Sequence, residues 1–404
     1  MKVIPDALCA RCGTCEGVCP EGIIREDDRG FPIVLNREEC TGCGLCKKVC
    51  PGMLVDFPPY CEDEESDFNP YLGFFFKVLS ARSIDKKDAQ FSASGGGVSA
   101  LLKYLFKENL INCAFTVKID NKYPFAAYPY LSRNIEDVED SRQSKYQPVM
   151  LNKLLREMKD DDKAAVVGLP CHLHGLRKAE EAISPLRDKI ILHIGLFCGF
   201  NMEREATFFL IRKLGMMRND IENIYYRSGR WPGGFLVEDT KGNRKFVSKE
   251  DYSLLNYLFL PKRCSTCPDY SAELSDISFG DAWYKKTGEG WNSVIVRNKE
   301  AQSILEGAEL VIEEANAEMI VDSHKFVIDF KKRGALKRIA VANEEYPKFN
   351  NYPSSLLEMT LSSFDKYFLI FYRWRNLFIN IFRILPFSLF RITSRLLRRK
   401  SIGK

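Results

Sequence analysis

The sequence predicts a small α+β module, then a larger α/β body with a mixed sheet, and finally a basic amphipathic helical tail. Three observations support this division. A cysteine run occurs twice within residues 9–51, strand-like and helix-like segments alternate from about residue 71, and basic residues accumulate after residue 361. We expect the module at residues 1–57, a polar linker at 58–70, the body at 71–350 and the tail at 361–404.

The doubled run has the form Cys-x2-Cys-x2-Cys-x3-Cys-Pro, first over residues 9–20 and again over residues 40–51. This is the spacing of bacterial-type ferredoxins, in which three cysteines of one run and the last cysteine of the other hold each [4Fe–4S] cluster. The run therefore predicts a bacterial-type ferredoxin domain with two clusters. One cluster is assigned to Cys9, Cys12, Cys15 and Cys50, and the other to Cys40, Cys43, Cys46 and Cys19.

Zinc and disulfides explain the doubled run less well. Zinc sites use four ligands, usually from two cysteine pairs, whereas each run here has four cysteines and ends in Cys-Pro. Disulfides would require an exported chain, and the N-terminus lacks the apolar segment of a signal peptide. We therefore expect a cytoplasmic protein with reduced thiols. Cys61 is expected to be a bystander and Cys113 a small core residue.

The net charge of +5 is unevenly distributed. Residues 361–404 contain ten Lys or Arg and one Asp, whereas the other 360 residues contain 49 Lys or Arg against 53 Asp or Glu. A mildly acidic body argues against nucleic acid as a partner.

The tail begins with an apolar stretch over residues 367–385 that contains Arg373, Arg375 and Arg383. Because an arginine at the centre of a membrane-spanning helix costs about 2.5–3.5 kcal/mol, this stretch is not expected to cross a bilayer. Basic and apolar residues then alternate after Pro386. This pattern favours peripheral binding to an anionic membrane on its inner face, with packing on a partner subunit as the alternative.

The body alternates between strand and helix patterns, which predicts a mixed sheet covered by helices. We expect strands over residues 74–81, 113–119, 164–169, 190–197, 276–279 and 293–296, helices over 98–106, 151–158 and 203–214, and a hairpin over 235–248.

A glycine-rich turn precedes the helix expected at residues 98–106. It contains Ser92, Ser94, Gly95, Gly96 and Gly97. Consecutive glycines let backbone N–H groups approach a phosphate at a helix N-terminus. The turn therefore indicates a cradle for the pyrophosphate of a nucleotide or flavin. A glycine turn with a serine N-cap is the alternative.

Four further cysteines form a second constellation. Cys171 and Cys198 each follow a predicted strand, and Cys264 and Cys267 form a Cys-x2-Cys pair. Because ligands of open α/β sheets bind beyond the carboxyl ends of the strands, these four thiolates are candidates for a third [4Fe–4S] cluster. A zinc knuckle or buried cysteines are the alternatives.

Four side chains near these strand ends are further candidates for site residues. His172 and His174 flank Cys171 and are expected to cap backbone groups rather than donate protons. Asp281 and Trp283 follow another predicted strand, where Asp281 is a candidate for positioning a ligand and Trp283 for stacking on a flat ring.

Several motifs together carry a resemblance to a known family. They are residues 92–96, 144–147, 168–171 with 175–176, 196–198, 263–269, and 276–277 with 280–283. In this order they make residues 71–345 similar to the family of coenzyme F420 hydrogenase and dehydrogenase beta subunits. His172 departs from this likeness, because glutamine is expected there.

The resemblance implies a flavin-binding body that holds noncovalent FAD and a [4Fe–4S] cluster, and hydride exchange between a deazaflavin and the FAD. By the same resemblance, Ser94–Gly97 faces the flavin pyrophosphate, Lys145 and Tyr146 line the flavin or substrate pocket, and the four body cysteines bind the cluster. No catalytic residue is assigned, because the flavin needs no protein nucleophile.

The leading hypothesis is an iron–sulfur flavoprotein oxidoreductase that passes electrons between a two-electron donor at FAD and the clusters. Reduced coenzyme F420 is the candidate donor, and ferredoxin or a respiratory redox complex is the candidate partner. Two alternatives stay open: a ferredoxin-fed FAD reductase of an organic substrate in polysaccharide or tetrapyrrole metabolism, and a non-catalytic electron-relay subunit.

Overall fold

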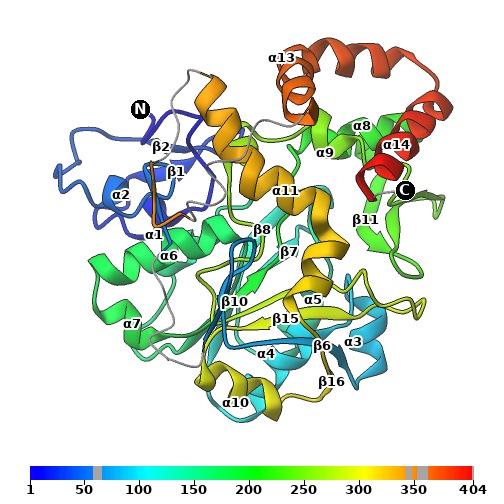
Figure 1. The fold of residues 1–404 in the computed structure, drawn as a ribbon. Coiled ribbons are helices and arrows are strands. Elements are labelled where there is room, and N and C mark those ends of the chain that lie inside the picture. Colours follow the sequence, from blue (N-terminus) through cyan, green and yellow to red (C-terminus); the bar gives the residue numbers. More distant parts are fainter. Residues whose placement is uncertain (58–65, 343–347, 353–362, 403–404) are drawn as a thin grey trace.

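The computed structural model describes residues 1–57, 66–342, 348–352 and 363–402 (Figure 1). The body is built on an eight-stranded sheet. Across the sheet the strands are β16 (Leu310–Glu314), β6 (Lys77–Ser83), β15 (Asn292–Val296), β14 (Ile277–Asp281), β10 (Ile190–Leu196), β9 (Ala164–Gly168), β7 (Cys113–Ile119) and β8 (Ala127–Ser132). The central strands β14, β10, β9 and β7 run parallel to one another. Each of the outer strands β16, β6, β15 and β8 is antiparallel to the strands next to it. The predicted mixed sheet is therefore confirmed.

Alternate residues of the central strands face two separate cores, as the two-residue period of a strand requires. On β9, Ala165 faces a core built with α4 (Gly97–Lys107) and α10 (Lys299–Gly307). Its neighbours Ala164 and Val166 face the other core, which contains α6 (Pro170–Ala182) and the 3-10 helix η1 (Leu151–Arg156). Both faces of the sheet are thus buried, and functional residues lie at its ends.

The remaining elements surround this sheet. They are α3 (Lys86–Phe91), α5 (Ile135–Asp140), α7 (Pro185–Lys189), α8 (Glu205–Lys213), η2 (Arg218–Asp220), α9 (Leu255–Leu258), η3 (Lys262–Thr266) and α11 (Ala317–Ala342), with a three-stranded antiparallel sheet of β11 (Ile221–Ser228), β12 (Gly234–Asp239) and β13 (Arg244–Ser248).

Most of the expected elements of the body are present, with three differences. The segment expected to be a helix over 151–158 is the 3-10 helix η1, and the strand expected over 74–81 divides into β5 (Gly73–Phe75) and β6. The sequence did not predict the strands β8, β11 and β16, the longer helices α6, α10 and α11, or the short helices α3, α5, α7 and α9.

The N-terminal module contains two short helices, α1 (Thr14–Gly17) and α2 (Leu45–Lys48), each within one cysteine run. Strands β1 (Ile24–Glu26) and β2 (Pro32–Val34) pair, and β3 (Leu54–Asp56) pairs with β17 (Lys348–Asn350). Within the segment expected to be a linker, β4 (Asp67–Asn69) pairs with β5. Cys61 lies outside the described residues, and Cys113 is buried in the core as expected.

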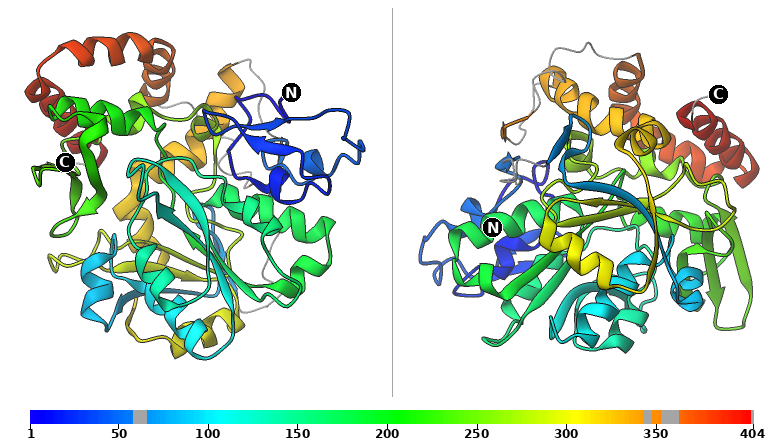
Figure 2. Two further views of the ribbon diagram at one scale, coloured as in Figure 1. Left: turned by 180° about the vertical axis from the view of Figure 1, so that it is seen from behind. Right: turned by 60° about the horizontal axis from the view of Figure 1, so that its bottom comes forward.

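The tail forms α13 (Ser363–Ile384) and α14 (Phe387–Ile402), which cover the α8, α9 and β11 side of the body (Figures 1 and 2). Phe390 is fully buried beside Phe209, and an Arg338–Asp365 ion pair of 2.6 Å joins α11 to α13. The described part of the tail is helical, and one of its faces packs on the chain's own body. Among the described residues, no helix is both long and apolar enough to span a membrane.

If the tail belongs to the folded body, Phe390→Ala should lower the free energy of unfolding by about 3–5 kcal/mol, because a fully buried aromatic ring is lost. The neighbouring Leu389 is half exposed, so Leu389→Ala should change the free energy of unfolding by less than about 0.5 kcal/mol. Urea unfolding of the full chain measures both, and equal effects would contradict the packing of α14.

Candidate functional site

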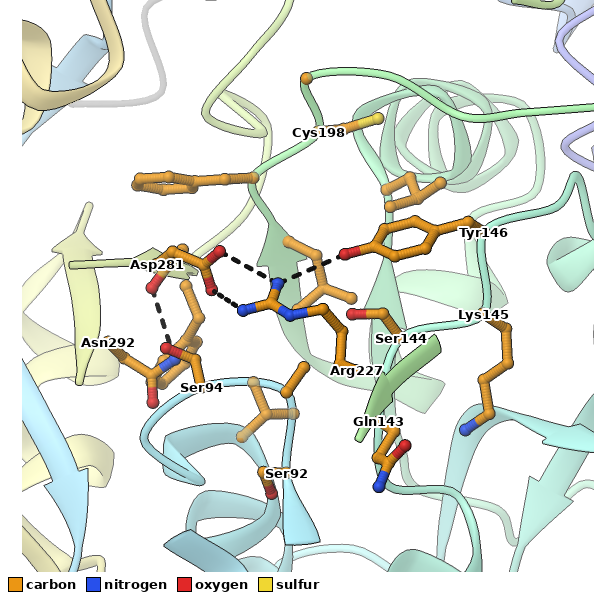
Figure 3. A pocket seen from close by; sticks show the side chains of 18 of the residues that line it. Ser92, Ser94, Gln143, Ser144, Lys145, Tyr146, Cys198, Arg227, Asp281 and Asn292 are labelled. Atoms are coloured by element: carbon orange, nitrogen blue, oxygen red, sulfur yellow. Dashed lines mark hydrogen bonds and ion pairs between the residues drawn. The ribbon is translucent and has the colours of Figure 1, made fainter. Parts of the chain in front are cut away.

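A cavity of about 700 Å³ opens beyond the carboxyl ends of β9, β10 and β14 (Figure 3). Its lining comes from the glycine-rich turn at residues 92–99, the loop at 141–147, the segment after β10, strand β11 and helix α11. All eight flavin-site residues predicted from the sequence lie in this region: Ser92, Ser94, Gly96, Gly97, Lys145, Tyr146 and Asp281 line the cavity, and Gly95 belongs to the same turn.

The glycine-rich turn packs tightly against the start of β15. Gly96 has a φ of +78° and is the N-cap of α4, so the serine N-cap considered as an alternative is absent. The Gly97 N–H donates to Asn292 Oδ1 at 2.9 Å, and Ser94 Oγ donates to the Trp291 carbonyl at 2.7 Å. Ser92 Oγ is buried without a hydrogen-bond partner, which leaves a polar atom for a ligand.

The loop at residues 141–147 forms another side of the cavity. Gln143 has a φ of +70°, a conformation that is strained for a residue other than glycine, and its Oε1 is buried without a partner. Lys145 points away from Arg227 (Figure 3) and donates to the Arg142 carbonyl at 2.6 Å. Burial lowers the pKa of Lys145 to about 7. Lys145 therefore holds the loop in shape, while Tyr146 reaches into the cavity.

Tyr146 belongs to a buried charged group that the sequence did not reveal. Arg227 donates to Tyr146 Oη at 3.3 Å and to Asp281 Oδ2 at 3.1 Å, and Lys249 Nζ lies 3.9 Å from the centroid of the Tyr146 ring. Burial alone would raise the pKa of Tyr146, but the charges of Lys249 and Arg227 outweigh it and hold this pKa at about 8. Arg227 and Lys249 come from β11 and from the end of β13, where no motif marks them.

The four body cysteines come together at one end of this cavity. Cys171 lies in the first turn of α6 after β9, Cys198 follows β10, and Cys264 and Cys267 lie in and just after η3. Burial raises the pKa of Cys171 well above its usual value, and the neighbouring Cys198, Cys264 and Cys267 raise it further. Cys198 also lines the cavity. The four cysteines that the sequence analysis expected to meet beyond the strand ends therefore lie close together.

The ferredoxin cysteines also fall into the two predicted crossed groups. The pKa of Cys15 is raised first by burial and then by Cys12, Cys50 and Cys9, and that of Cys46 by burial and then by Cys43, Cys19 and Cys40. Within the described ranges, no group of three His, Cys, Asp or Glu side chains forms a site for a single metal ion. A [4Fe–4S] cluster has a different requirement, because each of its four irons takes one thiolate.

Buried thiols of this kind suit an iron–sulfur cluster. Burial raises the pKa of Cys9 to about 12 and that of Cys50 to about 11. Bare thiolates would therefore be costly here, and bound iron would compensate their charge.

The two histidines near Cys171 have structural partners. His172 Nδ1 accepts from the Leu169 N–H at 3.1 Å, and Nε2 lies 3.0 Å from the Val149 carbonyl, so the predicted backbone capping is confirmed. His174 differs from that prediction, because its Nε2 bonds Asp269 Oδ2 at 2.8 Å. Trp283 lines the cavity, and its ring lies against Trp231 with centroids 4.9 Å apart.

One buried asparagine joins the ferredoxin module to the body cysteines. Asn152 Nδ2 donates to Thr14 Oγ1 at 2.8 Å and to the His172 carbonyl at 2.7 Å, and its backbone N–H donates to the Cys12 carbonyl at 2.9 Å. Cys12 is the first neighbouring thiol that raises the pKa of Cys171. These hydrogen bonds of Asn152, hereafter the junction, therefore connect the module to the body where Cys12 of the first ferredoxin group lies beside Cys171 of the body group. Nothing in the sequence marked Asn152.

Comparison with known proteins agrees with this arrangement. Residues 78–156 match the N-terminal model, and residues 161–319 the C-terminal model, of the coenzyme F420 hydrogenase/dehydrogenase beta subunit. Residues 1–51 match a 4Fe-4S dicluster domain.

Three known proteins illustrate the similarity. The chain is 32% identical to one of the subunits of the F420H2 dehydrogenase of Methanosarcina mazei, over 74% of this chain and 81% of that protein. It is 28% identical to a coenzyme F420-dependent sulfite reductase of Methanocaldococcus jannaschii, over 86% of this chain but only 53% of that protein, so it spans about half of that relative. A chain of the F420-reducing [NiFe] hydrogenase complex from Methanosarcina barkeri shares the fold, with a TM-score of 0.55 at 23% identity over 71% of this chain and 100% of that one.

Replacing Asn152 should weaken the junction. Asn152→Ala leaves the Thr14 hydroxyl and the His172 carbonyl without their buried donor, which should cost about 1–3 kcal/mol. Urea unfolding of the cluster-loaded protein measures this loss, and electron paramagnetic resonance measures the spin coupling between clusters, which should weaken. Asn36→Ala is the control, because Asn36 is exposed and bonds only within the module. Unchanged coupling in Asn152→Ala would contradict the role of the junction.

The charged group in the cavity predicts an unusual tyrosine titration. In cofactor-free protein, the difference between wild-type and Tyr146→Phe ultraviolet absorbance should show one phenol ionising near pH 8. Lys249→Met should move this midpoint upward, because a neighbouring positive charge that favours the phenolate is lost. Tyr128→Phe, outside the cavity, should leave it unchanged. A single transition near pH 10 would show that Tyr146 does not feel these charges.

Proposed function

This chain belongs to the family of coenzyme F420 hydrogenase/dehydrogenase beta subunits, and on that basis we propose that it is an iron–sulfur flavoprotein oxidoreductase. In this proposal FAD binds in the cavity, reduced coenzyme F420 delivers two electrons there, and the [4Fe–4S] clusters carry them away one at a time. The observation that carries the proposal is the position of Cys198, which lines the cavity and also belongs to the body cysteine group.

The cavity suits an anionic, partly aromatic ligand such as a flavin dinucleotide. Its volume lies within the range of small-molecule sites. Its lining contains the basic residues Arg142, Arg227 and Lys249 against the carboxylates Asp281 and Asp322, and also Lys145, whose pKa burial lowers to about 7. Ser92 Oγ and Gln143 Oε1 are buried polar atoms without partners. These features favour a phosphate-bearing ligand near the glycine-rich turn.

When bound, a flavin accepts two electrons as a hydride and releases them singly to one-electron carriers. The protein's residues would bind and orient it. Asp281 fixes the Arg227 guanidinium, which bonds Tyr146 Oη. Because the pKa of Tyr146 is held at about 8, its Oη can retain or release a proton near neutral pH. The glycine-rich turn and the loop at residues 141–147 enclose the ligand from two sides.

Three cysteine groups would hold the clusters in sequence from the cavity outward. The body group, Cys171, Cys198, Cys264 and Cys267, adjoins the cavity, and Cys171 neighbours Cys12 of the first ferredoxin group. Cys15 of that first group in turn neighbours Cys46 of the second group. Cys40 and Cys43 of the second group are exposed. An external redox partner, a ferredoxin or a component of a redox complex, would therefore meet the chain at this last group.

An anaerobic experiment tests the function and the third cluster together. Protein purified without oxygen should contain bound FAD and about twelve irons per chain, four for each cluster. Mixing with reduced coenzyme F420 should rapidly bleach the flavin absorbance and then the cluster absorbance. Cys198→Ser should lower the iron content to about eight and slow bleaching of the remaining clusters. Cys113→Ser is the control, because Cys113 is buried in β7 outside every group.

The other outcomes identify the alternatives. Bound FAD that only reduced ferredoxin bleaches would overturn F420 as the donor and favour a reductase of an organic substrate. Loaded clusters without flavin would favour an electron-relay subunit. Full iron content in Cys198→Ser would contradict the third cluster.

A further inference from the structure

The outward side of α13 carries a continuous row of exposed apolar side chains. The row, hereafter the α13 stripe, consists of Tyr367, Ile370, Trp374, Leu377, Ile381 and Ile384. Their spacing of three and four residues places them on one side of a helix, along about 26 Å. Tyr367 is 71% exposed and Ile384 is 86% exposed. Such a row is unusual on the surface of a protein that has no further partner.

The α13 stripe is distinct from the face that packs on the body. Phe368 and Ile379 point inward and are buried, and Phe368 packs against Phe330 of α11 with ring centroids 5.0 Å apart. Helix α13 is therefore apolar on two sides. Because an apolar helix face is normally buried and the body covers only one of the two, the outer side of α13 suits a second apolar environment.

Helix α14 also carries exposed apolar side chains, and it is anchored on the body. Leu389, Ile392 and Leu396 are exposed, whereas Ser394 is buried and accepts from the Leu254 N–H at 3.0 Å. Arg391 forms a 2.8 Å ion pair with Asp251 of the body. The exposed rows of α13 and α14 thus belong to a rigid surface, which lies on the opposite side of α11 from the ferredoxin module (Figures 1 and 2).

The positive charge of the tail indicates what kind of surface can bind to α13 and α14. Residues 366–404 contain ten Lys or Arg and no Asp or Glu. Arg373 and Arg383 are both exposed on α13, and the helical period places Arg373 next to the α13 stripe. Among the nearby carboxylates, Asp251 and Asp365 are buried and already paired with arginines of the chain itself, whereas Glu250 is exposed near Arg395. A partner surface that binds α13 and α14 therefore needs negatively charged groups around an apolar interior.

We propose that the outward surface of α13 and α14 binds an anionic membrane, with α13 lying in the plane of the lipid headgroups. A row of exposed apolar side chains that includes Trp374 and Tyr367, on a helix with the exposed arginines Arg373 and Arg383, has the features of a helix that lies in the interface. A second copy of the chain fits less well, because two such surfaces would bring like charges together. This proposal does not depend on the flavin or on the electron donor.

The test measures sedimentation of the full cluster-loaded chain with vesicles. The chain should sediment with vesicles of mixed phosphatidylglycerol and phosphatidylcholine, at least tenfold more than with phosphatidylcholine alone, and less as salt is added. The combined variant Ile370→Ser, Trp374→Ser, Leu377→Ser and Ile381→Ser should reduce binding at least tenfold. Arg373→Gln with Arg383→Gln should weaken binding to anionic vesicles and reduce its dependence on salt.

Matched controls separate membrane binding from general stickiness. Phe246 and Phe68 are exposed aromatic residues elsewhere on the chain, so Phe246→Ser and Phe68→Ser should leave vesicle binding unchanged. Equal binding to neutral vesicles, or unchanged binding of the four-residue variant, would overturn the proposal. A dimer that dissociates in that variant, with no vesicle binding by the wild type, would identify a second copy as the occupant and overturn it as well.

Discussion

The arrangement of the chain depends on how closely the ferredoxin module approaches the body. A Cβ atom at Gly175 of α6 would lie 2.2 Å from Thr14 Oγ1, and one at Gly17 would lie 2.2 Å from the Asn152 carbonyl oxygen. Only glycine permits these contacts, even though it loses more conformational entropy on folding than other residues. This close packing holds Cys12 beside Cys171. The module is therefore fixed against the body, so electrons would need no domain motion to pass between their cysteine groups.

The sequence predicted the parts of the site that depend on short spacings along the chain, and it missed the parts that depend on contacts between distant segments. The crossed ferredoxin groups depend on short, fixed spacings, and the body group depends on strand ends that must share one edge of a sheet. Arg227 and Lys249 reach the cavity only because the three-stranded sheet packs beside it, and no local pattern records that contact. Helix α11 was missed because Lys331, Lys332 and Arg338 are buried in it and obscure its apolar period. Partners from distant segments, Glu273 for Lys332 and Asp365 for Arg338, offset their charge.

The cavity combines features that cost stability unless a ligand is bound. Ser92 Oγ and Gln143 Oε1 are buried without hydrogen-bond partners, and Gln143 has a strained backbone. Unsatisfied buried groups cost about 1–3 kcal/mol each and strained residues a similar amount. The rest of the fold tolerates this cost because the sheet and its two cores are well packed. Such costs concentrate at binding sites, which is why we propose the cavity, rather than any surface groove, as the place for a cofactor.

The tail shows why an amphipathic pattern must be interpreted together with packing. From the sequence, one apolar face was expected to meet a membrane or a partner. In the structure, the tail packs against the body through Phe368 and Phe390. The α13 stripe, on the other side of α13, stays exposed. A surface helix with one apolar face needs one partner, and a helix with two needs a second. The ferredoxin module lies across α11 from this surface (Figure 2). A chain held at a membrane by α13 would therefore keep the exposed Cys40 and Cys43 accessible to a separate redox partner.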